Sequence, residues 1–267
     1  MITFLVHNSN ILFLYQSVSN MDLLLQNEHF ISETIKLYIS KTKLIHTVLN
    51  SNFQIHVYSK TKNKKLIEYI NICSDRITKI IKHYDLKKFL EIYIIDCPEK
   101  RLFRDDPHYI NGAFTFPNQN QIFVYRKKEL SKVLIHEVLH HIYSFEHSMI
   151  TNNCIEINPN EAIIEFLATI WQLKLTNSSI QKEKQHSKIN SQKVLFLLKD
   201  KDLHKSNIYS YIVVKHILML HSKKVLEYLK NNKFKNIYDI IYNYKLNIKP
   251  LKVFSKEELR FVLCSNL

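Results

Sequence analysis

The sequence is poor in residues that cross-link a chain or let its backbone turn sharply: 267 residues include four cysteines, five prolines and one glycine. The cysteines stand far apart, at positions 73, 97, 154 and 264, and form no C-x-x-C pair. We therefore predict reduced, buried thiols in an intracellular protein. No stretch has the composition of a separate low-complexity domain, and 46% hydrophobic residues suffice for one sizeable core or two lobes.

Long hydrophobic runs are also missing. Residues 1–15 are apolar but are interrupted by His7, Asn8 and Asn10, and they lack a basic start. They are too short and too polar to span a bilayer. We therefore expect neither a signal peptide nor a membrane anchor, and we predict that residues 1–20 form a disordered extension.

Arginine is scarce although the chain is strongly basic, with a formal net charge of +14 at pH 7. Only five of the 38 basic residues are arginine, the side chain that proteins prefer for forked contacts with bases and phosphates. We interpret the charge as a solvated lysine surface and expect no nucleic-acid partner.

One motif carries chemistry: H-E-x-x-H at residues 136–140. Residues four apart share a helix face, so His136 and His140 can present ring nitrogens to one ion while Glu137 lies beside its open position. If residues 129–147 form a helix, the apolar residues make one arc, and the two histidines lie nearly opposite it, facing a cleft. The motif predicts a zinc site that activates water, with Glu137 as the general base.

A second motif, N-E-x-x-x-E, follows at residues 160–165. Glu161 and Glu165 lie four apart on one stripe of an otherwise apolar helix, which suits a third metal ligand and an acid beside it. Another interpretation needs no metal. With Asn158 as the N-cap and Pro159 at the first helical position, Glu161 would reach back to the cap amide.

The two motifs resemble those of gluzincin zinc metallopeptidases, whose thermolysin-like members carry H-E-x-x-H on one helix and N-E-x-x-x-(D/E) on the next. The resemblance covers residues 110–170 in its motifs and the rest of the chain in layout alone. It implies that Glu137 is the general base and that Glu165 fixes the tautomer and orientation of His136. It implies three ligands for one Zn²⁺: His136, His140 and Glu161.

Other candidates for the third ligand fit less well. The metzincin pattern needs glycine and histidine where this chain has Tyr143 and Glu146. Glu156 and His147 are weaker substitutes for Glu161, and we expect His141 on the flank of the helix rather than at the metal.

The expected fold class is α+β: a small mixed β-sheet lobe with the active-site helix, followed by an all-helical lobe, in a zincin-like two-lobed architecture. We place the catalytic lobe at residues 21–175 and the helical lobe at 190–267, with 176–192 as a linker or mobile loop. Periodicity predicts the following elements: strands at 53–59, 88–96, 111–116 and 121–125, and helices at 65–84, 129–147, 193–200, 206–221, 223–231, 234–244 and 255–264.

Gly112, the only glycine, opens one of these strands, which suggests that another backbone approaches closely there. Proteases of this type bind substrate as an added strand, and the N-A-F edge strand of thermolysin resembles residues 111–114. Gly112, Ala113 and Phe114 are therefore our candidates for the substrate-binding edge. The alternative is a simple hairpin with a bulge glycine.

The helical lobe should supply a group that stabilises the oxyanion formed during hydrolysis. The candidates are Tyr209, Tyr211 and His216, and we choose Tyr211. Aromatic residues at helical spacing also suit a plain core role.

These observations predict a zinc metallopeptidase acting on a peptide or protein substrate. The G-x-M-x-N signature of aminopeptidases does not precede the motif helix, which favours an endopeptidase over an exopeptidase. Two further classes stay open: a catalytically silent basic binding module on the same fold, and a zinc hydrolase with a different substrate.

Overall fold

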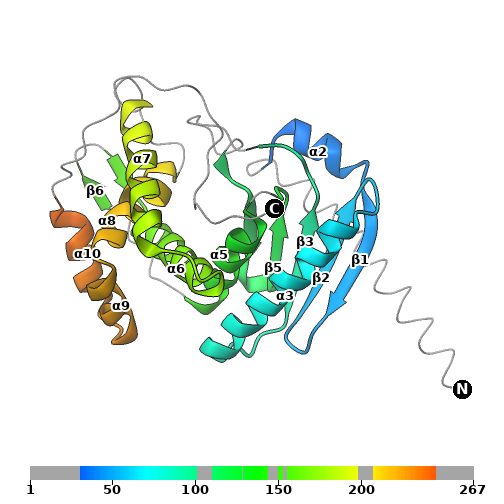
Figure 1. Ribbon diagram of the computed structural model, residues 1–267, viewed down its shortest axis with the longest axis horizontal. Coiled ribbons are helices and arrows are strands. Elements are labelled where there is room, and N and C mark those ends of the chain that lie inside the picture. The colour runs from blue at the N-terminus through cyan, green and yellow to red at the C-terminus, as the bar shows by residue number, and fades with distance from the viewer. Residues whose placement is uncertain are drawn as a thin grey trace, which may run out of the picture.

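The computed structural model describes residues 31–100, 110–127, 129–143, 150–152, 155–197 and 207–244. Within these residues the fold is α+β, with a five-stranded mixed sheet and eight α-helices (Figure 1). This confirms the α+β class with a mixed sheet. The predicted extension at 1–20 and the predicted helix at 255–264 lie outside the described residues.

The sheet has the strand order β1-β2-β3-β5-β4. Strands β2, β3 and β5 run parallel, while β1 and β4 pair antiparallel at the two ends of the order. Helix α3, Lys64–Tyr84, connects β2 to β3. The strand bounds are Lys43–Leu49 for β1, Phe53–Ser59 for β2, Leu90–Ile95 for β3, Ala113–Phe116 for β4 and Gln121–Val124 for β5. Four of the five strands were predicted; β1 was not.

Side chains along the central strands alternate between two cores, as a sheet covered on both faces requires. Ile92 and Ile122 belong to the larger core with α3 and the motif helix. Tyr93 and Phe123 point to the other face, where their rings stack with centroids 4.8 Å apart. Helix α2, Glu33–Ile39, covers this face. Both faces of the sheet are thus occupied, and the site must lie at its edge or beyond.

The motif helix, α5, spans Leu130–Ile142 and packs between the sheet and α6, Pro159–Leu175 (Figure 1). It ends earlier than predicted because Tyr143 has extended backbone angles. Every residue from Leu130 to Leu139 is buried, the charged ones included. On the face predicted to look into a cleft, His136 and Glu137 line a pocket. The larger core continues past α5 and α6 to the last described helix.

The remaining elements lie on the far side of α5 from the sheet (Figure 1). The helices predicted at 223–231 and 234–244 are confirmed to within one residue, and part of the helix predicted at 206–221 is a π-helix. The bounds of the elements on this side are β6 Ile150–Asn152, β7 Ile155–Ile157, α7 Ile180–Leu197, π-helix η3 Ser210–Val214, α8 Lys215–Leu220, α9 Ser222–Lys230 and α10 Phe234–Asn243. In the sheet, the 3₁₀ turn η1, Pro117–Gln119, joins β4 to β5.

The linker predicted at 176–192 was wrong, because most of it belongs to helix α7. The buried stripe of α7 is polar and recurs at helical spacing, so hydrophobic periodicity could not detect it. Glu183 Oε1 forms a buried ion pair with Lys215 Nζ at 3.4 Å. Ser187 Oγ lies 2.7 Å from His216 Nδ1, and Ser191 Oγ donates a hydrogen bond to the Ile212 carbonyl. Mutual pairing lets these polar groups be buried.

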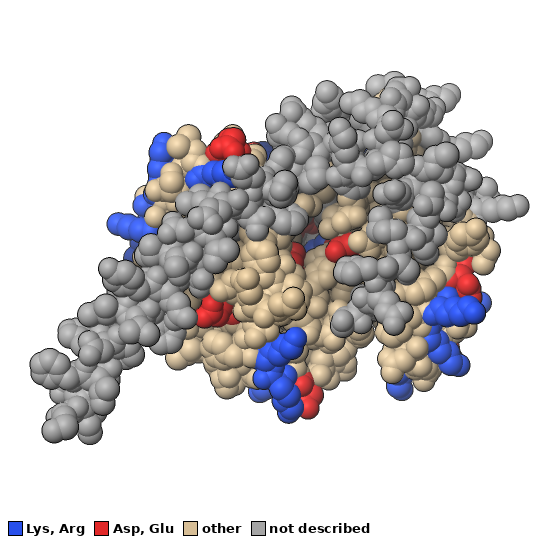
Figure 2. Space-filling model, turned by 180° about the vertical axis from the view of Figure 1, so that it is seen from behind, with Lys and Arg blue, Asp and Glu red and all other residues tan. Residues whose placement is uncertain are grey.

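Three composition-based expectations can be compared with the structure. Cys73 and Cys97 are free and buried, as predicted, whereas Cys154 and Cys264 lie outside the described residues. None of the described helices combines the length and apolar character needed to cross a bilayer. On the face shown in Figure 2, the described Lys and Arg side chains form separate groups with uncharged surface between them.

His216 makes folding stability depend on pH. Burial, followed by the charge of Lys215, lowers its pKa to about 4 from the ordinary 6.5. Between these values the unfolded chain takes up a proton that the folded protein does not, so this group destabilises the fold as pH falls from 6.5 towards 4. Urea unfolding at pH 7.5 and at pH 5 gives the fall in the free energy of unfolding for each protein. We expect this fall to be about 1 to 2 kcal/mol smaller for His216→Asn than for the wild type. Equal losses for the two proteins would contradict the assignment.

Candidate metal centre

His136 and His140 lie one helical turn apart on α5, and their Nε2 atoms are 3.1 Å apart. Glu161, in the first turn of α6, places Oε2 at 3.4 Å from His136 Nε2 and 3.6 Å from His140 Nε2. The three candidate ligand atoms all lie within 4.8 Å of one another. The structure therefore brings together the three predicted ligands from two helices.

Glu161 does not cap its helix. Asn158 and Pro159 begin α6 as predicted, with the Asn158 side chain accepting a hydrogen bond from the Glu161 amide. The Asn158 amide, which a capping glutamate would bind, instead donates to Ser210 Oγ at 3.0 Å. Among the described residues, Glu161 Oε2 is buried with no hydrogen-bond partner. A buried carboxylate oxygen beside two imidazole nitrogens fits a divalent metal ion such as Zn²⁺.

Glu165 lies one turn after Glu161 and contacts His136 from the other side of the ring. Its Oε2 is 2.9 Å from His136 Nδ1, in the position predicted for the orienting acid. A proton on Nδ1 would leave the Nε2 lone pair directed towards Glu161 and His140. Glu165 and Glu161 thus contact His136 from opposite sides of its ring, as the predicted roles of the two acids require.

Lys132 is the residue that the sequence analysis missed. Its ammonium group forms an ion pair with Glu165 Oε2, and both side chains are buried. The available signal was its spacing: Lys132 precedes His136 by four residues and therefore shares its helix face. A lysine on the stripe of a buried helix that carries the candidate ligands requires a partner, and Glu165 supplies one.

The charges of this cluster shift one another's pKa values. Burial lowers the pKa of His136, but the neighbouring Glu161 and Glu165 raise it more, to about 9. Burial raises the pKa of Glu161, while the two histidines outweigh burial and lower it well below its usual range. The pKa of Glu137 is raised, chiefly by burial, although the histidines oppose the shift.

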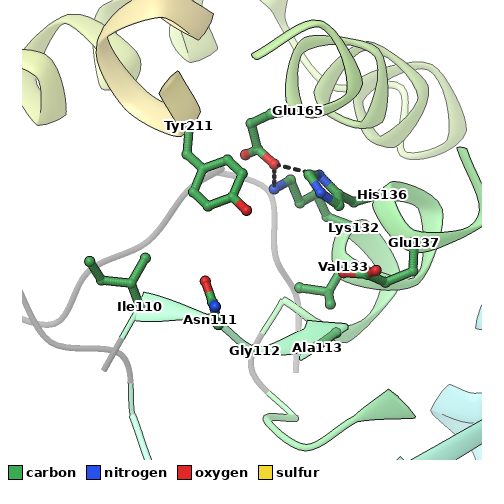
Figure 3. A pocket seen from close by; sticks show the side chains of 10 residues that line it. All are labelled: Ile110, Asn111, Gly112, Ala113, Lys132, Val133, His136, Glu137, Glu165 and Tyr211. Atoms are coloured by element: carbon green, nitrogen blue, oxygen red, sulfur yellow. Dashed lines mark hydrogen bonds and ion pairs between the residues drawn. The ribbon is translucent and has the colours of Figure 1, made fainter. Parts of the chain in front are cut away.

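A pocket opens beside the cluster, between α5, the start of β4 and the π-helix η3 (Figure 3). Tyr211 directs its hydroxyl into this pocket, and its ring lies 5.8 Å from that of His136. Burial, followed by the charges of Glu161 and Glu137, raises its pKa well above 10, so the phenol keeps its proton. The lining residues are Ile110, Asn111, Gly112, Ala113, Lys132, Val133, His136, Glu137, Glu165 and Tyr211.

The other two candidates from the helical region lie elsewhere. Tyr209 packs against the large core, and His216 contacts Ser187 on α7. His141 also stays apart from the cluster, with Nε2 2.6 Å from Thr115 Oγ1. His147 and the side chain of Glu156 lie outside the described residues.

The three residues predicted for the substrate-binding edge lie in two different places in the structure. Gly112 and Ala113 line the pocket, whereas Phe114 stacks on Phe123 in the core on the opposite face of the sheet. Strands β4 and β5 form a hairpin whose register from Ala113–Val124 to Phe116–Gln121 is regular, and Gly112 does not have a positive φ. The hairpin of the alternative interpretation is therefore confirmed, but its glycine bulge is not. The Gly112 carbonyl accepts a hydrogen bond from the Tyr125 amide at 3.0 Å.

Comparisons of the chain with protein-family models, with curated proteins and with solved structures find no significant match. Any functional conclusion therefore depends on the geometry of the site.

We expect Zn²⁺ to raise the melting temperature of protein that has been dialysed against a chelator. At a free concentration 100-fold above its Kd, the ion should stabilise the fold by about 2.7 kcal/mol, a shift of several degrees. His140→Ala should abolish the shift because it removes one of the three candidate ligands. The control is His141→Gln, which alters the next residue on the same helix and should keep the shift. A zinc shift that survives His140→Ala would exclude this site.

Proposed function

We propose that this protein is a zinc-dependent metallopeptidase, and that it acts as an endopeptidase in a cleft between a sheet-bearing lobe and a helical lobe. The observation that carries the proposal is the convergence of His136, His140 and Glu161, with Glu137 on the wall of the adjoining pocket. The gluzincin-like motifs gain support because the two helices that carry them pack against each other. The position of α5 between the sheet and helices α6 to α10 suits the two-lobed arrangement (Figure 1).

Zn²⁺ held by these three side chains would supply Lewis-acid activation of water and of the scissile carbonyl. Glu137 is placed to move the proton. Its carboxylate lines the pocket, and burial raises its pKa from the usual value for glutamate towards the working pH. Such a carboxylate can take a proton from water and return it to the nitrogen of the departing amine.

The substrate would bind along β4. Gly112 bonds to β5, and backbone groups of successive residues in a strand point to opposite edges, so the amide and carbonyl of Ala113 point away from β5. An extended peptide could pair with Ala113 as an added antiparallel strand. This route leads past the pocket that Gly112 and Ala113 share with Glu137 (Figure 3).

Tyr211 is placed to stabilise the oxyanion. Its hydroxyl enters the pocket from the wall opposite residues 111–113 (Figure 3). Because its pKa is raised well above 10, it can donate a hydrogen bond throughout the reaction.

Glu137→Gln tests the reaction. We expect peptide hydrolysis to fall about 100- to 10,000-fold because the amide cannot accept the proton, while zinc affinity stays close to that of the wild type. Cleavage of a peptide library, read by mass spectrometry alongside a zinc titration, measures both. If the wild type binds zinc but cleaves no peptide, a silent binding module or another hydrolase would replace the proposal.

Tyr211→Phe tests the oxyanion donor. We expect kcat to fall about 100- to 1000-fold with little change in zinc affinity, because the variant removes one hydroxyl and no ligand. Tyr209→Phe is the matched control, since Tyr209 lies two residues away and does not line the pocket. Equal effects of the two substitutions on kcat would refute the assignment of Tyr211.

A further inference from the structure

One carboxylate oxygen joins the candidate metal centre to a buried lysine. Glu165 Oε2 lies 2.9 Å from His136 Nδ1 and also receives the Lys132 ammonium group (Figure 3). The side chains of Lys132 and Glu165 are 2% and 1% exposed. The lysine therefore contacts the carboxylate that contacts a predicted ligand.

The pairing of α5 with α6 does not explain this lysine. Apolar side chains of both helices already share the large core. One residue earlier on α5, Ser131 donates a buried hydrogen bond to Gln172 of α6 at 2.8 Å. A buried ion pair is a poor source of net stability, because the cost of desolvating two charges offsets their attraction. The burial of Lys132 is therefore not explained by a contribution to the packing of the two helices.

The balance of charges in the site explains why a lysine is buried there. Three carboxylates, those of Glu137, Glu161 and Glu165, lie around the histidines, and Lys132 is the lysine that lines their pocket. When all three are ionised, the lysine and a divalent ion together match their charge. The lysine forms its ion pair with Glu165, which of the three carboxylates is neither a predicted ligand nor the predicted base.

We propose that Lys132 is a positioning residue for the metal centre: it fixes the Glu165 carboxylate against His136 Nδ1 and so holds His136 Nε2 towards the ion. The inference rests on the proposed zinc site but does not depend on which bond the protein hydrolyses. In this role Lys132 acts on the ion position through Glu165, the partner of its ion pair.

A double-mutant cycle tests this dependence. We expect Lys132→Met to weaken zinc affinity about 10- to 100-fold, as losing a contact around a ligand does. Glu165→Gln should have a similar effect, and Lys132→Met should add nothing in the Glu165→Gln background, because the lysine acts through that carboxylate. Competition against a chromophoric chelator gives the affinities. The visible spectrum of the Co²⁺-loaded protein should change in the same way for both single variants, since both disturb one imidazole.

The matched control is Ser131→Ala, which removes the neighbouring contact between α5 and α6. It should lower thermal stability and leave zinc affinity and the Co²⁺ spectrum unchanged. If Lys132→Met does not fold, the double variant Lys132→Met/Glu165→Leu removes both buried charges together and is compared with Glu165→Leu. Equal zinc affinities in that pair support the proposal, and a weaker double variant overturns it.

The outcomes separate this inference from the proposed function. Wild-type affinity in Lys132→Met, or effects of Lys132→Met and Glu165→Gln that simply add, would overturn the role of Lys132 and leave the metal centre intact. Failure of the wild type to bind zinc or cobalt would overturn the metal centre itself, and Lys132 with it.

Discussion

Charged side chains buried between α5 and α6 must find their partners inside the protein, and the geometry of the site follows from this constraint. Lys132, His136 and His140 occur at one-turn intervals on α5. Glu161 and Glu165 occur at a one-turn interval on α6 and run in the opposite sense, so Lys132 meets Glu165, His140 meets Glu161, and His136 lies between the two acids. Sliding either helix by one turn would leave a buried charge without a partner, at a cost of several kcal/mol. The contacts that make the site are thus all satisfied in the observed register of the two helices.

Buried polar side chains also find their partners inside the helical part of the protein. Helix α7 buries a polar stripe whose members bond to the segment around η3 and α8, as in the Glu183–Lys215 pair. The π-helix in this segment carries Tyr211 to the pocket, and π-helical turns are frequent at functional sites. Polar contacts with α7 therefore support the wall of the pocket that Tyr211 forms.

Sequence reasoning worked where one signal dominated. Helical spacing placed His136 and His140 on one face, and alternation of apolar residues located the central strands. It failed where tertiary partners decide the outcome. The stripe of α7 is polar and pairs with residues about 30 positions later, so no local pattern marks it as buried. Lys132 was missed for the same reason, because its significance appears only beside Glu165, and a hydrophobic count treats it as a solvent-facing residue.

Glu161 shows how one contact can decide between two sound interpretations of a sequence. The N-cap pattern and the ligand pattern use the same glutamate, and local spacing satisfies both. The choice is made by Ser210, which accepts the hydrogen bond from the Asn158 amide that a capping glutamate would otherwise accept. Ser210 begins the π-helix, and the next residue is Tyr211. A single hydrogen bond thus leaves the Glu161 carboxylate to face the histidines and ties the segment that carries Tyr211 to the start of α6. The proposed ligand Glu161 and the proposed oxyanion donor Tyr211 are coupled through that bond, although 50 residues of sequence separate them.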